Sequence, residues 1–95
     1  MITAIVLITV ATDQIPEAAQ AVSEIDGVTE CYSVAGDADL VAMVRVREHE
    51  KLADVIAGQI SKVPGVLATN TMIAFRAYSR HDLEAAFAIG YESDK

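Results

Sequence analysis

Residues 34–48 read VAGDADLVAMVRVRE, and this stretch decides the fold. Its segment Gly36–Asp39 holds a glycine and two aspartates, residue types that dominate tight turns. An apolar run over residues 28–34 precedes this turn, and a second one over residues 40–47 follows it. Two β-rich runs joined by a short polar turn predict an antiparallel hairpin at the centre of the chain.

A helix is predicted on each side of this hairpin. Apolar residues recur at helical spacing over residues 15–25 and again over residues 52–63. Residues 12–14 offer side-chain oxygens that could cap the first helix, and Pro16 suits its first turn. A proline and a glycine at the end of the second apolar stripe stop the second helix.

Two outer strands complete the pattern, one over residues 2–11 and one from residue 66 to about residue 79. The stretches IDGV at 25–28 and VPGV at 63–66 resemble each other, and each ends a helix and begins a strand. The order is therefore β-α-β-β-α-β, the ferredoxin-like arrangement of an α+β fold. Right-handed crossovers place both helices on one face of a four-stranded antiparallel sheet, with the first and third strands at its centre.

The last strand is unusually long. About 14 residues at ~3.3 Å each would span roughly 46 Å, whereas strands usually have five or six residues. We therefore expect it to overhang the domain. Residues 79–82, SRHD, resemble a capping signal for a short tail helix. The predicted organisation is a ferredoxin-like domain over residues 1–79 and a tail with a helix over residues 80–95.

The sheet face away from the helices is predicted to be apolar. The first strand places Ile5 and Leu7 on that face, and the third strand places Val41 and Met43 there. An exposed apolar face marks an interaction surface. A two-fold dimer with its sheets face to face is the simplest closed way to cover it. The tail helix could instead fold back over its own sheet, or the assignment of faces could be shifted by one residue.

Composition excludes several classes of protein. The formal charge is −7, from 14 acidic and 7 basic residues, without a Lys/Arg cluster, so direct nucleic-acid binding is not expected. A single cysteine, Cys31, excludes a disulfide framework and indicates an intracellular, cytoplasmic protein. The apolar N-terminus is too short to span a membrane and lacks the basic region of a signal peptide.

Three motifs together resemble the effector-binding domain of the leucine-responsive (Lrp/AsnC) transcriptional regulators. They are GDADL at residues 36–40, PGV at 64–66 and TNT at 69–71, and the resemblance covers about residues 2–78. It implies dimers formed through the sheets and assembled further into rings of dimers. It also implies small effectors, usually amino acids, bound at contacts between dimers near the central hairpin.

One departure from the family concerns DNA binding. Full-length members place a helix-turn-helix domain before this module, whereas here Met1 leads directly into the first strand. We therefore expect a stand-alone effector domain that lacks its own DNA-binding domain. Such a chain could join the rings of full-length Lrp/AsnC regulators.

The expected ligand-binding residues are Gly36, Asp37, Asp39, Thr69 and Thr71. The resemblance matches Gly36 and Asp39 to the family's Gly-x-x-Asp hairpin motif, and the two threonines to the start of its last strand. Either aspartate could accept hydrogen bonds from an effector's ammonium group. Backbone N–H groups near Gly36 could approach a carboxylate closely. Ordinary turn chemistry and β-propensity explain the same residues without any ligand.

No catalytic residue, metal site or cofactor is expected. No His or carboxylate pair has a tight metal-ligand spacing, and no glycine-rich phosphate loop is present. His49 is interpreted as a polar residue at the start of the second helix, and Cys31 as a small packing residue.

Three other functions remain open. A small dimeric α/β-barrel enzyme, of the monooxygenase or isomerase type, would need polar residues between helices and sheet, where this sequence has Val, Ile, Leu and Ala. An ACT-like amino-acid sensor would bind near the first strand–helix turn, which contains no glycine here. A purely structural assembly protein without a ligand is the third.

Overall fold

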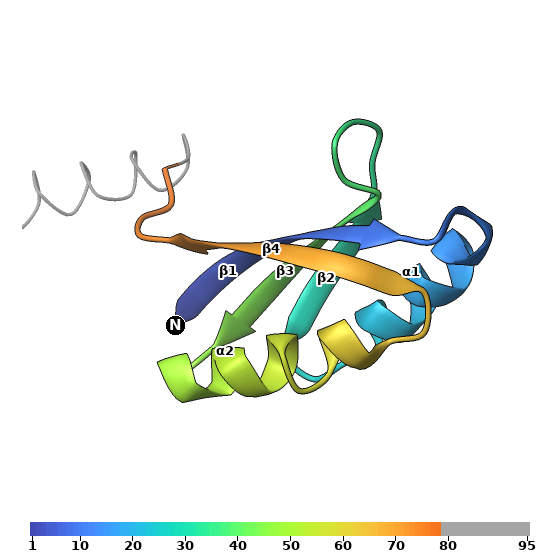
Figure 1. Ribbon diagram of the computed structural model, residues 1–95. Helices are drawn as coiled ribbons and strands as arrows, with labels where there is room; N and C mark the ends of the chain where they lie inside the picture. The colour runs from blue at the N-terminus through green and yellow to red at the C-terminus, as the bar shows by residue number, and fades with distance from the viewer. Residues whose placement is uncertain (79–95) are drawn as a thin grey trace, which may run out of the picture.

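The computed structural model describes residues 1–78, which form a sheet of four strands with both helices on one face (Figure 1). The elements follow the predicted order and are β1 (Ile2–Val10), η1 (Thr12–Gln14), α1 (Ile15–Ser23), β2 (Val28–Ser33), β3 (Leu40–Val46), α2 (His49–Ile56), η2 (Ile60–Lys62) and β4 (Val66–Ala74). The predicted ferredoxin-like α+β fold is thereby confirmed. The predicted tail helix and its SRHD capping signal lie outside the described residues.

The strand order in the sheet is β2-β3-β1-β4, and all three pairings are antiparallel. The first and third strands are central, as predicted. Ile5 in β1 pairs with Met43 in β3 and with Met72 in β4. Because side chains alternate along a strand, these three residues share one face of the sheet.

The core lies between the sheet and the helices. Alternate residues of β1 and β3 are buried there, and they pack against α1, α2 and η2. No buried residue in the range 1–78 is polar or charged. The core residues are Ala4, Val6, Ile8, Val10, Ala18, Val22, Leu40, Ala42, Val44, Val46, Leu52, Val55 and Ile60.

Gly27 and Gly65 explain why the two similar stretches in the sequence each end a helix and begin a strand. Their φ angles are 99° and 96°, a left-handed conformation that L side chains rarely adopt. Space is short as well, because a Cβ on Gly65 would lie 2.5 Å from the side-chain oxygen of Gln14. The carbonyl of Gly65 also accepts a hydrogen bond from the backbone N–H of Ala11 at 2.8 Å. The loop after the second helix is thus joined to the end of β1.

Gly65→Ala should therefore lower the free energy of unfolding by about 1–3 kcal/mol, because backbone strain of this kind has about that cost. The double variant Gly65→Ala/Gln14→Ala should regain the stability lost to the clash with the Gln14 side chain. It should not regain the stability lost to backbone strain at residue 65. Urea denaturation of wild type, both single variants and the double variant measures the two parts. Wild-type stability in Gly65→Ala would contradict the role assigned to this glycine.

Both helices differ in detail from the prediction. No side chain caps α1, because residues 12–14 form the turn η1, whose Gln14 N–H bonds the carbonyl of Ala11 at 2.9 Å. The second helix ends at Ile56 and does not continue to residue 63. At Gly58 the backbone comes so close to the Asp54 carbonyl that a Cβ would lie 2.4 Å from that oxygen. The apolar stripe nevertheless reaches the core, since Ile60 in η2 is fully buried.

The last strand is shorter than predicted. It ends at Ala74, which pairs with Thr3 near the start of β1. Beyond that pair the central strand has almost no residues left to bond, so the ladder stops. Phe75 follows the end of the strand and is 96% exposed. The predicted overhanging strand is therefore wrong for residues 75–78.

Candidate functional site

The hairpin loop between β2 and β3 projects beyond the end of the sheet (Figure 1). The two strands meet at the pair Ser33 and Leu40. The N–H of Val34 bonds the carbonyl of Asp39 at 3.0 Å and closes the loop. Gly36 has a φ of 134°, and nothing lies within 4 Å of a Cβ built on it. This glycine therefore provides a backbone conformation that L side chains rarely adopt, at an open position of the loop.

Asp39 is held by the backbone of β1. Its carboxylate oxygen Oδ2 accepts a hydrogen bond of 2.8 Å from the N–H of Val10, and its own N–H donates to the carbonyl of Ile8 at 2.9 Å. The β1–β3 ladder ends at the pair Ile8 and Leu40. The carboxylate thus supplies the acceptor that β3 no longer offers to Val10.

A pocket of about 210 Å³ lies between the hairpin loop and the paired strands β1 and β4. This volume is below the ~300–1,000 Å³ of pockets for drug-sized ligands, so it suits a small molecule. Its polar side chains are the carboxylate of Asp37, the hydroxyl of Thr9 and the amide of Asn70. Thr69 instead pairs with the core residue Ile8 and so has its side chain on the helix-facing side of the sheet. The lining residues are Leu7, Thr9, Asp37, Ala38, Ala68, Thr69 and Asn70.

Of the expected ligand-binding residues, this pocket brings together Asp37 and Thr69. Gly36, Asp39 and Thr71 are not part of its lining. Thr71 pairs with Val6 and so shares the helix-facing side of the sheet with that core residue.

Sequence reasoning missed two polar residues of the pocket, Thr9 and Asn70. Asn70 pairs with Leu7, and Thr9 pairs with Ala68. Both face away from the helices, next to the apolar residues already predicted for that face. The alternation of the strands could have indicated them, but only once the register between β1 and β4 was known.

The open face of the sheet, which no element of residues 1–78 covers, is apolar at its centre, as predicted. Its central residues come from three strands and are Ile5, Leu7, Val41, Met43 and Met72. A hollow of about 410 Å³ lies on this face, with Ile5, Met43 and Phe75 in its lining. The hairpin pocket adjoins the same face, because Leu7 belongs to both.

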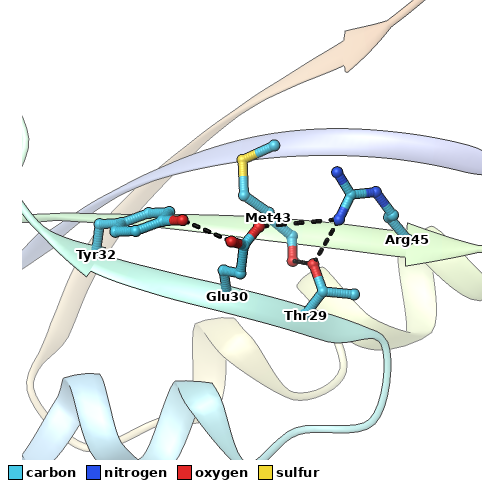
Figure 2. A network of polar contacts seen from close by, with 5 residues as sticks. All are labelled: Thr29, Glu30, Tyr32, Met43 and Arg45. Atoms are coloured by element: carbon cyan, nitrogen blue, oxygen red, sulfur yellow. Dashed lines mark hydrogen bonds and ion pairs between the residues drawn. The ribbon is translucent and has the colours of Figure 1, made fainter. Parts of the chain in front are cut away.

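Polar groups border this apolar centre along β2 and β3 (Figure 2). Thr29 is the extra residue of a β-bulge, because Val28 pairs with Val44 while Glu30 pairs with Met43. The Thr29 hydroxyl donates to the carbonyl of Met43 at 3.2 Å and accepts from Arg45 at 3.0 Å.

Two residues of β2 have shifted pKa values. The hydroxyl of Tyr32 donates to Glu30 Oε2 at 2.6 Å, and this hydrogen bond raises the pKa of Tyr32. Burial raises the pKa of the Cys31 thiol, which packs against the core. A thiol with a raised pKa remains protonated at neutral pH and is a poor nucleophile. Cys31 therefore packs as predicted.

Other kinds of site have little support. A larger hollow of about 600 Å³ lies between α2 and the end of β3, but its lining mixes Arg47 and Lys51 with three carboxylates and holds none of the expected residues. Within residues 1–78, no group of three His, Cys, Asp or Glu side chains could hold a metal ion. His49 is exposed at the first position of α2 and makes no capping bond. No helix in this part of the chain is long and apolar enough to cross a membrane.

Comparison with known proteins identifies the family. The profile described as Lrp/AsnC ligand binding domain matches residues 3–83. The chain belongs to this family. The resemblance inferred from the hairpin, PGV and TNT motifs is thereby confirmed. Lrp/AsnC proteins are transcriptional regulators, as the names of the relatives state.

Individual relatives agree with this assignment. TTHA0845 from Thermus thermophilus is 45% identical, with a TM-score of 0.79 over 84% of this chain and 100% of that one. The regulator LrpA1 of Halobacterium salinarum is 39% identical over 67 residues, which are 70% of this chain and 47% of the relative. The chain spans less than half the length of the curated relatives it matches.

A third relative was solved with a ligand. It is the feast or famine regulatory protein of M. tuberculosis complexed with L-methionine. It is 32% identical to this chain, with a TM-score of 0.70 over 84% of this chain and 54% of that one.

Proposed function

We propose that this Lrp/AsnC domain is a non-enzymatic regulatory module that binds a small, amino-acid-like effector and assembles with copies of itself. The observation that carries the proposal is the apolar open face of the sheet with a small polar pocket at its edge. Two copies related by a two-fold axis would cover each other's face. Dimers would assemble further into a ring.

The chemistry of the pocket suits a zwitterion. The carboxylate of Asp37 would accept hydrogen bonds from the ammonium group, and charge-assisted bonds of this kind are strong. Thr9 and Asn70 would supply polar contacts to the rest of the ligand. The complex of the M. tuberculosis relative with L-methionine supports an amino acid as the ligand class.

The enzyme and the ACT-like sensor receive less support. The interior between helices and sheet is filled by apolar side chains and contains no buried polar group among residues 1–78. Such an interior offers no acid, base or nucleophile for catalysis. The first strand–helix turn, where an ACT-like ligand would bind, is occupied by the 3₁₀ turn η1.

Regulation of DNA would pass through another chain or domain, because this one is strongly acidic. We propose full-length Lrp/AsnC regulators as partners in mixed rings, which goes with a cytoplasmic location. Native mass spectrometry of this chain mixed with a full-length regulator from the same organism tests the idea. Only unmixed oligomers in that spectrum would argue against it.

The effector is tested by a thermal-shift screen of the twenty amino acids. A ligand at ten times its Kd stabilises the folded state by about 1.4 kcal/mol, which raises the melting temperature by roughly 5–10 °C in a domain of this size. Asp37→Asn should weaken binding about tenfold or more, since a hydrogen bond to a charged group contributes ~1.5–3 kcal/mol.

Asp54→Asn is the matched control for this screen. It removes the same charge from the exposed surface of α2, away from the hairpin pocket. It should therefore keep the wild-type shift. If no amino acid raises the melting temperature, the chain is better described as a structural assembly module.

A further inference from the structure

Asp39 joins three segments of the fold at one position. Its carboxylate accepts from Val10 N–H at 2.8 Å, its N–H donates to Ile8 at 2.9 Å, and its carbonyl accepts from Val34 at 3.0 Å. Two of these contacts reach β1, and the third closes the hairpin loop. Within the described chain, no other hydrogen bond links residues 34–39 to β1.

The strand β1 is also the floor of the hairpin pocket. Leu7 and Thr9 line it from β1, while β4 forms one wall and is fixed to β1 by the sheet register. The opposite wall is made of Asp37 and Ala38, which directly precede Asp39. The distance between that wall and the floor therefore depends on how firmly Asp39 holds the loop.

We infer that Asp39 is a positioning residue, which fixes the hairpin loop to β1 and so shapes the pocket, and that it does not itself contact the effector. The family motif pointed to Asp39 as a ligand-binding residue, whereas we assign two separate roles to the two aspartates. Asp37 faces the ligand, and Asp39 holds the loop that presents Asp37. The part of this inference that concerns the effector rests on the proposed function.

Three variants separate these roles. Asp39→Asn keeps a side-chain oxygen that can accept from Val10, Asp39→Ala removes it, and Asp37→Asn removes only the ligand-facing charge. Two measurements are made on each protein: amide hydrogen exchange of Val10 by NMR, and the Kd for L-methionine or, if the screen finds a tighter amino acid, for that one. Asp54→Asn again controls for loss of one negative charge.

Asp39→Ala should speed exchange at Val10 by about tenfold or more, because an unbonded amide needs no opening before it exchanges. It should also shift the backbone resonances of residues 35–38 and weaken L-methionine binding. Asp39→Asn should keep exchange and affinity within about threefold of wild type, since the bond geometry survives. Asp37→Asn should lose affinity about tenfold with Val10 exchange unchanged.

Two results would overturn the inference. One is unchanged Val10 exchange and unchanged loop resonances in Asp39→Ala, which would mean that the carboxylate does not hold the loop. The other is an Asp39→Asn protein with intact Val10 protection but affinity as poor as that of Asp37→Asn, which would make Asp39 a ligand contact. If the wild type binds no amino acid, the proposed function fails, and the exchange and resonance data still decide whether Asp39 positions the loop.

Discussion

Ile5→Glu should convert the proposed dimer into a folded monomer. Ile5 lies at the centre of the open face, between Met43 and Met72. A carboxylate enclosed between two apolar sheets has no partner, and leaving a charge buried and unpaired costs several kcal/mol. Light scattering on a sizing column gives the mass of each protein, and circular dichroism confirms that the variant is folded.

Leu67→Glu is the control for this experiment. Leu67 is 69% exposed in a bulge of β4, where Val10 pairs with Val66 and Thr9 with Ala68. Leu67 is not among the central residues of the open face, so the dimer should tolerate a charge there. A wild-type protein that is folded but monomeric over the whole concentration range would remove the basis for assembly through the sheet. A dimer that tolerates Ile5→Glu would place the interface elsewhere.

Ile8→Ala should have the largest effect on stability and lower the free energy of unfolding by about 2–5 kcal/mol. Ile8 is among the largest fully buried side chains and lies in the central strand, facing the helices. Its truncation removes buried apolar area and leaves a cavity that the surrounding β-sheet cannot fill. The free energy of unfolding of a domain of this size is about 5–15 kcal/mol in total. The variant could therefore lose much of the stability that keeps it folded.

Guanidinium denaturation measures this loss, with Leu67→Ala as the control for an apolar truncation at the surface. The control should stay within about 0.5 kcal/mol of wild type. All proteins are compared at one concentration, because the proposed dimerisation would make apparent stability depend on it. A loss in Ile8→Ala no larger than in the control would mean that the core does not lie where the structure places it.

The fold was largely predictable because its signals are local and repeated. Alternation along the first strand assigns Val6 and Ile8 to one face and Ile5 and Leu7 to the other, and the structure confirms both assignments. The boundaries were less predictable. β4 ends at Ala74 because the antiparallel neighbour β1 begins close to that position, and no property of the last strand alone marks it.

The candidate site was only partly predictable. The motif match favoured Asp39 over Asp37, but the two residues are chemically identical and two positions apart, so the sequence alone could not assign a separate role to each. The structure places Asp37 in the lining of the pocket and engages Asp39 with the N–H of Val10, which lies 29 positions away in the chain. Thr9 and Asn70 could be assigned to the pocket only once the register between β1 and β4 was known.

By itself, the sequence determined the order of elements, the two faces of the first and third strands and the family, because periodicity, turn residues and short motifs act over a few positions. Only the tertiary structure decided where the ladders stop, which aspartate faces the pocket and which holds the loop. Those outcomes depend on hydrogen bonds between residues far apart in the chain, and such contacts exist only after the strands have paired in one register.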